Sequence, residues 1–515
     1  MRVQSWGVAT LAGAVIIGTL VTPALVAPAV AASGPAPTPT VDSAAVSPPD
    51  TEAALSWTRC GPRKRVRECA RLNVPIDYSD PEGPNVQIAL ARIPARDPAQ
   101  RRGAIVMDPG GPGISGVTEI LKYDSYLSDR LEDHYDVVGF DPRGVGASAP
   151  LWCRSTKQMD RYSNALAAAQ WSARADTAVV NRWAHQARLF GVGCARDRPD
   201  LVRHLGTIDA ARDLDRIRAA LGQPTLDYLG WSYGTKLGAV YADLFPGNVG
   251  RMVLDSAINP ALDISQFNRE QSRGMEAALH RFFRWCHSGR NCPLPRGRTH
   301  STAALKQFLL RLPSKRTAAH TATRADAMSA LATTMYHPDD LYPVLRHALR
   351  RAFAGDGRPL IRLGGGYGDQ DPDHPSNFLN ALYAINCYDS PATAGVARTA
   401  LLARRWGAAA PIFGAPAAWG VLRCHTFPAH TPIPTGPVSA PGAPPIVIIG
   451  ARRDAATPVA WSRQLAGQLV SSRLIVADTA IHSVYPGVNR CVRRAVDRFF
   501  LRGDAPPRRS ECPAD

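Results

Sequence analysis

The stretch Gly230-Trp231-Ser232-Tyr233-Gly234 decides the fold assignment, because its surroundings predict a strand, a sharp turn and a helix. A short β-prone run, residues 225–229, precedes it, and residues 235–245 carry apolar side chains at helical spacing after it. In this context the pattern G-x-S-x-G is typical of a nucleophile elbow, a strained turn that lifts a serine hydroxyl clear of the sheet edge. An ordinary turn with an idle serine is the alternative, so the interpretation depends on partner residues.

A serine nucleophile needs a histidine base and a carboxylate that orients the base, and around such an elbow they follow in the chain order Ser, acid, His. Residues 445–450 read as a buried parallel strand, with Asp454 shortly past its end, and the next strand, residues 473–477, leads to His482. Both side chains lie just beyond strand C-termini, the edge where ligands bind in open α/β sheets. We predict a catalytic triad of Ser232, Asp454 and His482.

Asp255 is the alternative acid, because it follows the apolar run 251–254, which also reads as a strand. Asp454 could instead be a surface-turn residue, and His482 a solvated loop residue. The chain order and the strand context favour the triad over these alternatives. We therefore assign Asp454 as the acid and keep Asp255 as its rival.

A glycine-rich loop offers an oxyanion hole. The apolar run Ala104–Met107 leads into Asp108-Pro109-Gly110-Gly111-Pro112-Gly113, where backbone without side chains can approach a substrate carbonyl. Hydrolases with a nucleophile elbow use the amide after the nucleophile and one amide from a loop of this kind. We predict that the backbone N–H groups of Gly111 and Tyr233 form the oxyanion hole.

The same loop also matches the dinucleotide-binding pattern G-x-G-x-x-G at Gly111, Gly113 and Gly116, with Asp141 at the end of the next strand as a ribose contact. A dinucleotide-binding oxidoreductase is therefore a rival interpretation. Pro112 counts against it, because proline removes one amide from the loop that would cradle a pyrophosphate. The oxidoreductase interpretation also leaves the series of Ser232, Asp454 and His482 unexplained. We therefore expect no cofactor.

Five segments together carry a family resemblance: Asp108–Gly113, Phe140–Ser148, Thr207–Asp215, Gly230–Thr235 and Ala384–Asp389. They resemble the secreted tripeptidyl aminopeptidases of actinomycetes, relatives of prolyl aminopeptidase within the α/β-hydrolase fold. The resemblance extends from about Trp57 to the C-terminus. It implies a helical lid over the active site and favours a disulfide between Cys387 and Cys424. It also implies that the protein removes short peptides, and tripeptides in particular, from free N-termini.

An enzyme that acts from a free N-terminus must bind an ammonium group, and burying that charge is costly unless a carboxylate pairs with it. The resemblance places Asp389 over the active site, so we predict that Asp389 binds the substrate N-terminus. A structural Asp that caps a helix or turn near Pro391 is the alternative. We predict a serine hydrolase, an aminopeptidase of the tripeptidyl-peptidase type. A prolyl aminopeptidase or secreted esterase with the same triad, and a catalytically silent envelope-binding protein, are the alternatives.

The N-terminal segment predicts export. Arg2 precedes the apolar run Val8–Ala27, and Ala29-Val30-Ala31 offers small residues for signal-peptidase cleavage. Pro23 and Pro28 interrupt the run, which favours a cleaved signal peptide over a membrane anchor. The ten cysteines, an even number, indicate an oxidising compartment and a disulfide framework whose connectivity the sequence leaves open. We expect a secreted protein, extracellular or associated with the cell wall, with no membrane contact after signal cleavage.

The composition and charge of the chain limit the classes of molecule that it is expected to bind. The formal net charge is +17, from 60 Lys and Arg against 43 Asp and Glu, but no arginine run is interleaved with aromatic residues as a single-strand groove requires. We expect no nucleic acid, weak attraction to an anionic cell wall, and peptide substrates with a free N-terminus. The sequence has no C-x-x-C and no H-E-x-x-H pattern, so we expect no metal site. We expect a monomer.

Strand and helix patterns alternate on both sides of a long helical segment, which predicts an α/β fold with a doubly wound, mostly parallel sheet. The helical segment lacks the strand-turn punctuation of its flanks and reads as an inserted cap. The predicted organisation is a signal peptide at 1–32, a disordered linker or removable prosegment at 33–56, an α/β-hydrolase core at 57–262 and 442–515, and a helical cap at 263–441.

Overall fold

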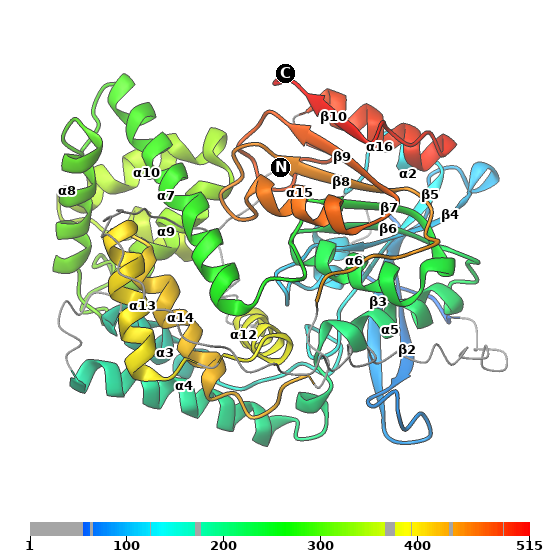
Figure 1. Cartoon of the computed structure of the whole chain (residues 1–515), viewed down its shortest axis with the longest axis horizontal. Helices are drawn as coiled ribbons and strands as arrows, with labels where there is room; N and C mark the ends of the chain where they lie inside the picture. Colours follow the sequence, from blue (N-terminus) through cyan, green and yellow to red (C-terminus); the bar gives the residue numbers. More distant parts are fainter. Residues whose placement is uncertain are drawn as a thin grey trace, which may run out of the picture.

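The computed structural model describes residues 55–61, 65–123, 125–169, 177–365, 376–392, 394–431, 436–487 and 489–515. The predicted signal peptide at 1–32 and nearly all of the predicted linker at 33–56 lie outside these residues. Figure 1 shows a core built on a sheet at one side of the molecule and a group of helices at the other side.

The described residues form one ten-stranded sheet with the order β1-β2-β3-β5-β4-β6-β7-β8-β9-β10. The strands are β1 (Thr58–Arg59), β2 (Glu68–Pro75), β3 (Asn85–Ile93), β4 (Gly103–Asp108), β5 (Tyr135–Phe140), β6 (Leu226–Trp231), β7 (Val249–Asp255), β8 (Ile446–Ala451), β9 (Ser472–Ala477) and β10 (Arg509–Cys512). Neighbouring strands are antiparallel from β1 to β5 and parallel from β5 to β10. The sheet is therefore mostly parallel, as predicted.

The central strands are buried on both faces, which is why their sequences are continuous apolar runs. In β8, Ile446 and Ile448 pack on one face of the sheet, and Val447 and Ile449 pack on the other. The first face is covered by α5 (Thr207–Ala220), α6 (Tyr233–Leu244) and α15 (Val459–Gln468), and the second by α1 (Gly116–Lys122), α2 (Asp129–Glu132) and α16 (Arg490–Arg502). Helices on both faces confirm the doubly wound α/β prediction.

The register brings the C-terminal ends of the central strands to one edge. Asp108 of β4 pairs with Gly230 of β6, and Asp255 of β7 pairs with both Trp231 of β6 and Ile449 of β8. The loops that follow these four strands therefore leave the sheet side by side. These loops carry every residue of the predicted triad except His482, which follows the adjacent strand β9.

A helical cap lies between β7 and β8 in the sequence. Its helices are α7 (Ile264–Ser288), α8 (Arg298–Arg311), α9 (Arg324–Tyr336), α10 (Pro338–Phe353), α11 (Arg358–Gly364), α12 (Phe378–Asp389), α13 (Val396–Ala409) and α14 (Gly414–His425). Helices α7 to α11 enclose a hydrophobic core of their own, which includes Leu279, Phe282, Leu331 and Leu345.

Two further helices join the cap from the segment between β5 and β6, namely α3 (Thr156–Ala169) and α4 (Thr177–Asp197). The aromatic side chains of Tyr162 and Trp183 pack edge to face, and the Trp183 indole N–H donates to the carbonyl of Trp419 in α14 at 3.1 Å. The cap therefore draws on residues outside the predicted range 263–441, because the apolar faces of α3 and α4 find their partners there. Three short 3₁₀ helices complete the elements: η1 (Pro98–Gln100), η2 (Leu201–Arg203) and η3 (Pro246–Asn248).

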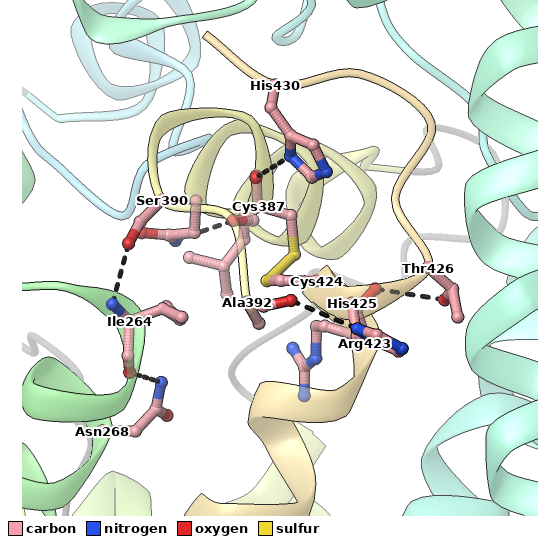
Figure 2. The surroundings of a disulfide bond; sticks show 12 residues. Ile264, Asn268, Cys387, Ser390, Ala392, Arg423, Cys424, His425, Thr426 and His430 are labelled. Carbon is pink, nitrogen blue, oxygen red and sulfur yellow. Dashed lines mark hydrogen bonds between the residues drawn. A yellow bond between two sulfur atoms is a disulfide. The ribbon is translucent and has the colours of Figure 1, made fainter. Parts of the chain in front are cut away.

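All ten cysteines form disulfides, and each pairs with its neighbour in the sequence: Cys60–Cys69, Cys153–Cys194, Cys286–Cys292, Cys387–Cys424 and Cys491–Cys512. The pairing confirms the bond between Cys387 and Cys424 that the family resemblance favours. This bond joins α12 to α14, and next to it the Ile264 amide at the start of α7 donates to Ser390 Oγ at 2.8 Å (Figure 2). Within the described ranges, the structure contains no helix with the length and apolar character of a membrane span.

Candidate active site

Ser232 occupies the turn between the end of β6 and the start of α6, as the sequence predicts. Its backbone has φ 54° and ψ −116°, a conformation that non-glycine residues rarely adopt. Hydrogen bonds hold the turn: the Ser232 amide donates to the carbonyl of Asp255 at 3.1 Å, and the Thr235 hydroxyl donates to the Ser232 carbonyl at 2.5 Å. Gly234 allows the close packing, because a Cβ there would lie 2.6 Å from the carbonyl oxygen of Asp108. The Ser232 side chain is partly exposed.

Asp454 and His482 form a buried pair in the loops after β8 and β9. The Nδ1 atom of His482 lies 2.9 Å from Oδ2 of Asp454. The other contacts of the carboxylate come from the following turn: the amides of Ala456 and Thr457 donate to Oδ1 at 2.7 and 3.1 Å, and the Thr457 hydroxyl donates to Oδ2 at 2.9 Å. The pair therefore has the geometry in which a carboxylate orients an imidazole and leaves its other nitrogen available.

The surroundings of Asp454 keep it ionised. Burial by itself raises the pKa of this carboxyl group, but the neighbouring His482 and the hydrogen bonds from Thr457 and Ala456 outweigh burial and lower the pKa below its usual value. A carboxylate that stays charged stabilises an imidazolium, which is the state of the base after it has taken a proton.

Tyr336, at the end of α9 in the cap, contacts His482 directly. The Tyr336 carbonyl accepts a hydrogen bond from the His482 amide at 3.1 Å, and the two rings pack edge to face with their centroids 4.9 Å apart. This contact fixes the backbone and the ring plane of His482 from the cap side. Sequence analysis misses Tyr336, because a tyrosine at the end of a cap helix carries no signal for a contact with a distant loop.

Asp255, the rival acid, makes no hydrogen bond to His482 among the described residues. Its Oδ2 accepts the Tyr485 amide at 2.7 Å, and its Oδ1 accepts the Ser256 hydroxyl at 3.2 Å. Burial raises the pKa of Asp255 to about 7, although the Tyr485 amide and the charge of His482 oppose this. Ser256 Oγ in turn accepts the Ser483 amide at 2.8 Å. Asp255 and Ser256 thus hold the backbone just after His482, a role that the sequence did not reveal.

The hydroxyl of Ser232 and Nε2 of His482 have no hydrogen bond to each other in the part of the chain that the structure describes. Catalytic hydrogen bonds are often long in the absence of substrate and tighten in the complex. The two residues belong to loops that are linked through Asp255 and Ser256, because Asp255 accepts the Ser232 amide and Ser256 accepts the Ser483 amide. The function of the three residues as one triad stays a prediction.

The predicted oxyanion loop lies against the Ser232 turn. A Cβ at Gly110 would lie 2.5 Å from the carbonyl oxygen of Trp231 and 3.1 Å from the Tyr233 amide nitrogen, so only glycine permits this approach. Neither the Gly111 amide nor the Tyr233 amide has a hydrogen-bond partner among the described residues. Two free N–H groups on adjoining segments suit the stabilisation of an oxyanion, and this role of Gly111 and Tyr233 stays a prediction.

Asp108 supports this loop from the end of β4. Its Oδ1 accepts the Gly110 amide at 2.6 Å, while its Oδ2 is buried and has no partner among the described residues. Burial raises the pKa of Asp108 to about 7, against the lowering effect of the Gly110 hydrogen bond. The sequence indicates the loop but gives no sign of this supporting contact.

The dinucleotide interpretation finds no support in the surroundings of the same loop. Asp141, the predicted ribose contact, uses its Oδ1 for the Ser115 hydroxyl at 2.6 Å and the Val117 amide at 3.1 Å, and its Oδ2 for the Ala147 amide at 2.7 Å. Cap helix α12 packs on the loop, since a Cβ at Gly113 would lie 3.0 Å from Cβ of Ala381. The carboxylate thus secures the start of α1 instead of facing a ligand.

Asp389 lies at the end of α12 and is almost fully buried, with 3% of its surface exposed. Its Oδ2 forms an ion pair with Lys236 Nζ at 2.7 Å and accepts the Thr207 hydroxyl, and its Oδ1 accepts the Thr207 amide at 2.8 Å. The carboxylate therefore joins the cap to the N-terminal turns of α5 and α6. A substrate ammonium would have to share it with Lys236, and the binding role of Asp389 stays a prediction.

Comparisons with known proteins agree with this architecture. The alpha/beta hydrolase fold family matches residues 103–486. Serine protease Hip1 of Mycobacterium tuberculosis (strain ATCC 25618 / H37Rv) is 31% identical over 494 residues, which cover 91% of this chain and 93% of that protein. A tripeptidyl aminopeptidase of Streptomyces lividans is 30% identical over 478 residues, covering 89% and 87%. Carboxylesterase B of Mycobacterium tuberculosis (strain ATCC 25618 / H37Rv) is 31% identical over 465 residues, covering 87% and 86%.

The resemblance to tripeptidyl aminopeptidases that the motifs indicate is confirmed by this similarity, which spans nearly the whole of both chains. The matched residues include strands β4 to β9, the Ser232 turn and the inserted helical cap. This chain therefore belongs to the alpha/beta hydrolase fold family.

Proposed function

We propose that the protein is a secreted serine exopeptidase that removes short peptides, specifically tripeptides, from free N-termini. The observation that carries the proposal is the buried Asp454–His482 pair, because the loop of His482 is linked through Ser256 and Asp255 to the strained Ser232 turn. Relatives named as a serine protease and a tripeptidyl aminopeptidase support a serine hydrolase of the peptidase type. The predicted signal peptide and the five disulfides support secretion.

In the proposed mechanism, Oγ of Ser232 attacks the scissile carbonyl while Nε2 of His482 takes the hydroxyl proton. Asp454 stabilises the resulting imidazolium through Nδ1. The Gly111 and Tyr233 amides hold the oxyanion of the tetrahedral intermediate. His482 then gives the proton to the leaving amine, and an acyl-enzyme remains on Ser232. Water, with its proton taken by His482, attacks the acyl-enzyme and releases the short peptide and the free Ser232 hydroxyl.

The cap supports the preference for a chain end. Helix α12 packs on the oxyanion loop at Gly113, and Tyr336 at the end of α9 packs on the base His482. Two cap helices therefore contact the predicted catalytic loops from separate positions. We expect these contacts to favour the end of a peptide over the middle of a long folded chain, because an internal segment would have to enter as a loop.

N-acetylation of the substrate tests the exopeptidase proposal without altering the protein. Acetylation removes the ammonium charge, and losing the partner of a desolvated charge costs about 2–5 kcal/mol of binding. We expect kcat/KM for a tripeptidyl reporter to fall at least about 30-fold on acetylation, and free one- and two-residue reporters to be poorer substrates than the free tripeptide. Equal cleavage of the free and the acetylated tripeptide contradicts the exopeptidase proposal and favours an endopeptidase.

The variant Asp389→Asn, assayed on the same two reporters, separates a binding role of Asp389 from a structural one. If Asp389 binds the substrate ammonium group, the substitution lowers kcat/KM for the free tripeptide and leaves kcat/KM for the acetylated tripeptide unchanged. If Asp389 only pairs with Lys236, both reporters lose activity by the same factor, because the cap contact is weakened for every substrate. The second result removes Asp389 from the binding site while the exopeptidase proposal stands on the acetylation result.

A secreted esterase with the same triad is the second candidate, and the similarity to carboxylesterase B is the observation that favours it. A small uncharged ester measures this activity directly. A kcat/KM for the ester that exceeds the value for every free peptidyl reporter would make the esterase the better description.

A further inference from the structure

Five arginines gather around two adjoining hollows on the core, away from the predicted catalytic loops. Arg130, Leu501 and Arg502 line both hollows; Arg102 completes the first, and Arg494 and Arg498 complete the second. The volumes are about 290 and 370 Å³. All five arginine side chains are exposed. We refer to Arg102, Arg130, Arg494, Arg498 and Arg502 as the arginine surface.

The arginine surface carries unbalanced positive charge. Within the described ranges, none of its five guanidinium groups forms an ion pair, whereas many other surface arginines, such as Arg96 and Arg358, do. Two acidic side chains, Asp133 and Asp497, line the hollows, and Asp497 interacts electrostatically with Arg130. Asp497 accepts the Tyr485 hydroxyl at 3.0 Å, and Asp133 lies 3.5 Å from Arg96. His134 also lines the first hollow, and its Nδ1 lies 2.9 Å from the Arg130 carbonyl.

The arginines are arranged in a row with two flanking members. Arg494, Arg498 and Arg502 follow one another at four-residue intervals on α16, so they lie on one face of the helix about 6 Å apart along its axis. Arg130 comes from α2, which packs against α16, and Arg102 precedes β4 and donates to the carbonyl of Leu501. The arginine surface therefore lines the edge of the two hollows and can bind several anionic groups at once.

The position of the arginine surface separates it from the proposed catalysis. Arg102 lies just before the start of β4, whereas the oxyanion loop follows the other end of the same strand. Figure 1 shows α16 and α2 on the side of the core away from cap helices α8, α13 and α14. A ligand on this surface therefore lies at the opposite end of β4 from the predicted oxyanion loop.

We propose that the arginine surface is a docking site for a phosphodiester polymer of the cell envelope. Guanidinium groups bind phosphate oxygens in a bidentate manner, and a row of them suits a polymer with regularly repeated phosphates. The five disulfides indicate an oxidising compartment outside the cytoplasm, where an anionic polymer belongs to the envelope and is not nucleic acid. Docking would keep the enzyme at the cell surface.

Binding of full-length protein to fluorescent poly(glycerol phosphate) tests the proposal. The triple variant Arg494→Gln, Arg498→Gln, Arg502→Gln is compared with a matched control, Arg398→Gln, Arg404→Gln, Arg405→Gln. The control removes three exposed arginines from cap helix α13 that form no ion pair with any described residue. We expect the first variant to bind at least about tenfold more weakly at 0.1 M salt and to lower the slope of log K against log salt by about 2, because three phosphate contacts are lost. The control should bind as the wild type does, and peptide hydrolysis should be unchanged in both.

Four outcomes decide the proposal. Loss of binding in the α16 variant alone supports it. Equal losses in both triple variants overturn it, because they indicate a response to net charge and not to this surface. Absence of wild-type binding at 0.1 M salt overturns it as well. Binding to phosphatidylglycerol vesicles or to polygalacturonate in preference to poly(glycerol phosphate) overturns the assignment to a phosphodiester polymer.

Discussion

Replacing Ser232 by Ala is expected to lower kcat for peptide hydrolysis by at least about 10⁴-fold, because no other group can form the acyl-enzyme. The protein should stay folded, since the turn is held by backbone atoms of Ser232 and by Thr235, and neither contact uses the Ser232 hydroxyl. Alanine still has to adopt the positive φ of this turn, so a small loss of stability is expected. Single-turnover and steady-state assays on a free tripeptidyl reporter measure the effect.

A matched variant, Ser155→Ala, controls for the loss of a serine hydroxyl. Ser155 is exposed at the start of α3, and its replacement should leave kcat within about twofold of the wild-type value. Retention of more than about a tenth of the activity by folded Ser232→Ala protein contradicts the assignment of Ser232 as nucleophile.

Replacing Asp454 by Asn is expected to lower kcat by about 10⁴-fold, the size of effect known for the orienting acid of a serine triad. An amide at this position can donate to His482 Nδ1 and would favour the wrong tautomer of the base. The surrounding donors stabilise the negative charge of Asp454, because the amides of Ala456 and Thr457 both donate to its Oδ1. Asp454→Asn therefore loses the stabilisation of the imidazolium as well as the tautomer.

Asp255→Asn is the matched control for Asp454→Asn, because both residues are buried acids at the C-terminal edge of the sheet, near the loop that carries His482. Asp255 has a pKa raised to about 7 by burial, so an uncharged amide resembles the form that its surroundings favour. Its oxygen can still accept the Tyr485 amide. We expect a loss of kcat below about 30-fold. A larger loss in Asp255→Asn than in Asp454→Asn would reverse the assignment of the acid.

Much of the core was predictable from the sequence, because parallel strands buried on both faces appear as continuous apolar runs. Once the runs before Ser232 and before Asp454 are taken as parallel strands of one sheet, the topology of that sheet brings the loops after them to one edge. The structure pairs Asp454 with His482 as the chain order predicts. The sequence favoured Asp454 over Asp255, and the structure adds that Asp255 accepts the Tyr485 amide and the Ser256 hydroxyl.

Sequence patterns could not predict the contacts between the cap and the core. Tyr336 meets His482 and Lys236 meets Asp389 only after helices far apart in the sequence have packed together. Helical periodicity gives the apolar face of each helix but not its partner, so α3 and α4 could not be assigned to the cap. The Lys236 partner also changes the electrostatics of Asp389, which the sequence alone presents as an unpaired acid.

The measurement that tests the central claim most directly is covalent labelling with a fluorophosphonate, followed by intact-mass and peptide-mapping mass spectrometry. The account predicts one adduct per chain, on Ser232, formed as Oγ attacks phosphorus and fluoride leaves, with loss of peptide hydrolysis in proportion to labelling. Asp454→Asn should label much more slowly, and Ser232→Ala should not label. An adduct on another residue, or full labelling without loss of peptide hydrolysis, would contradict the account.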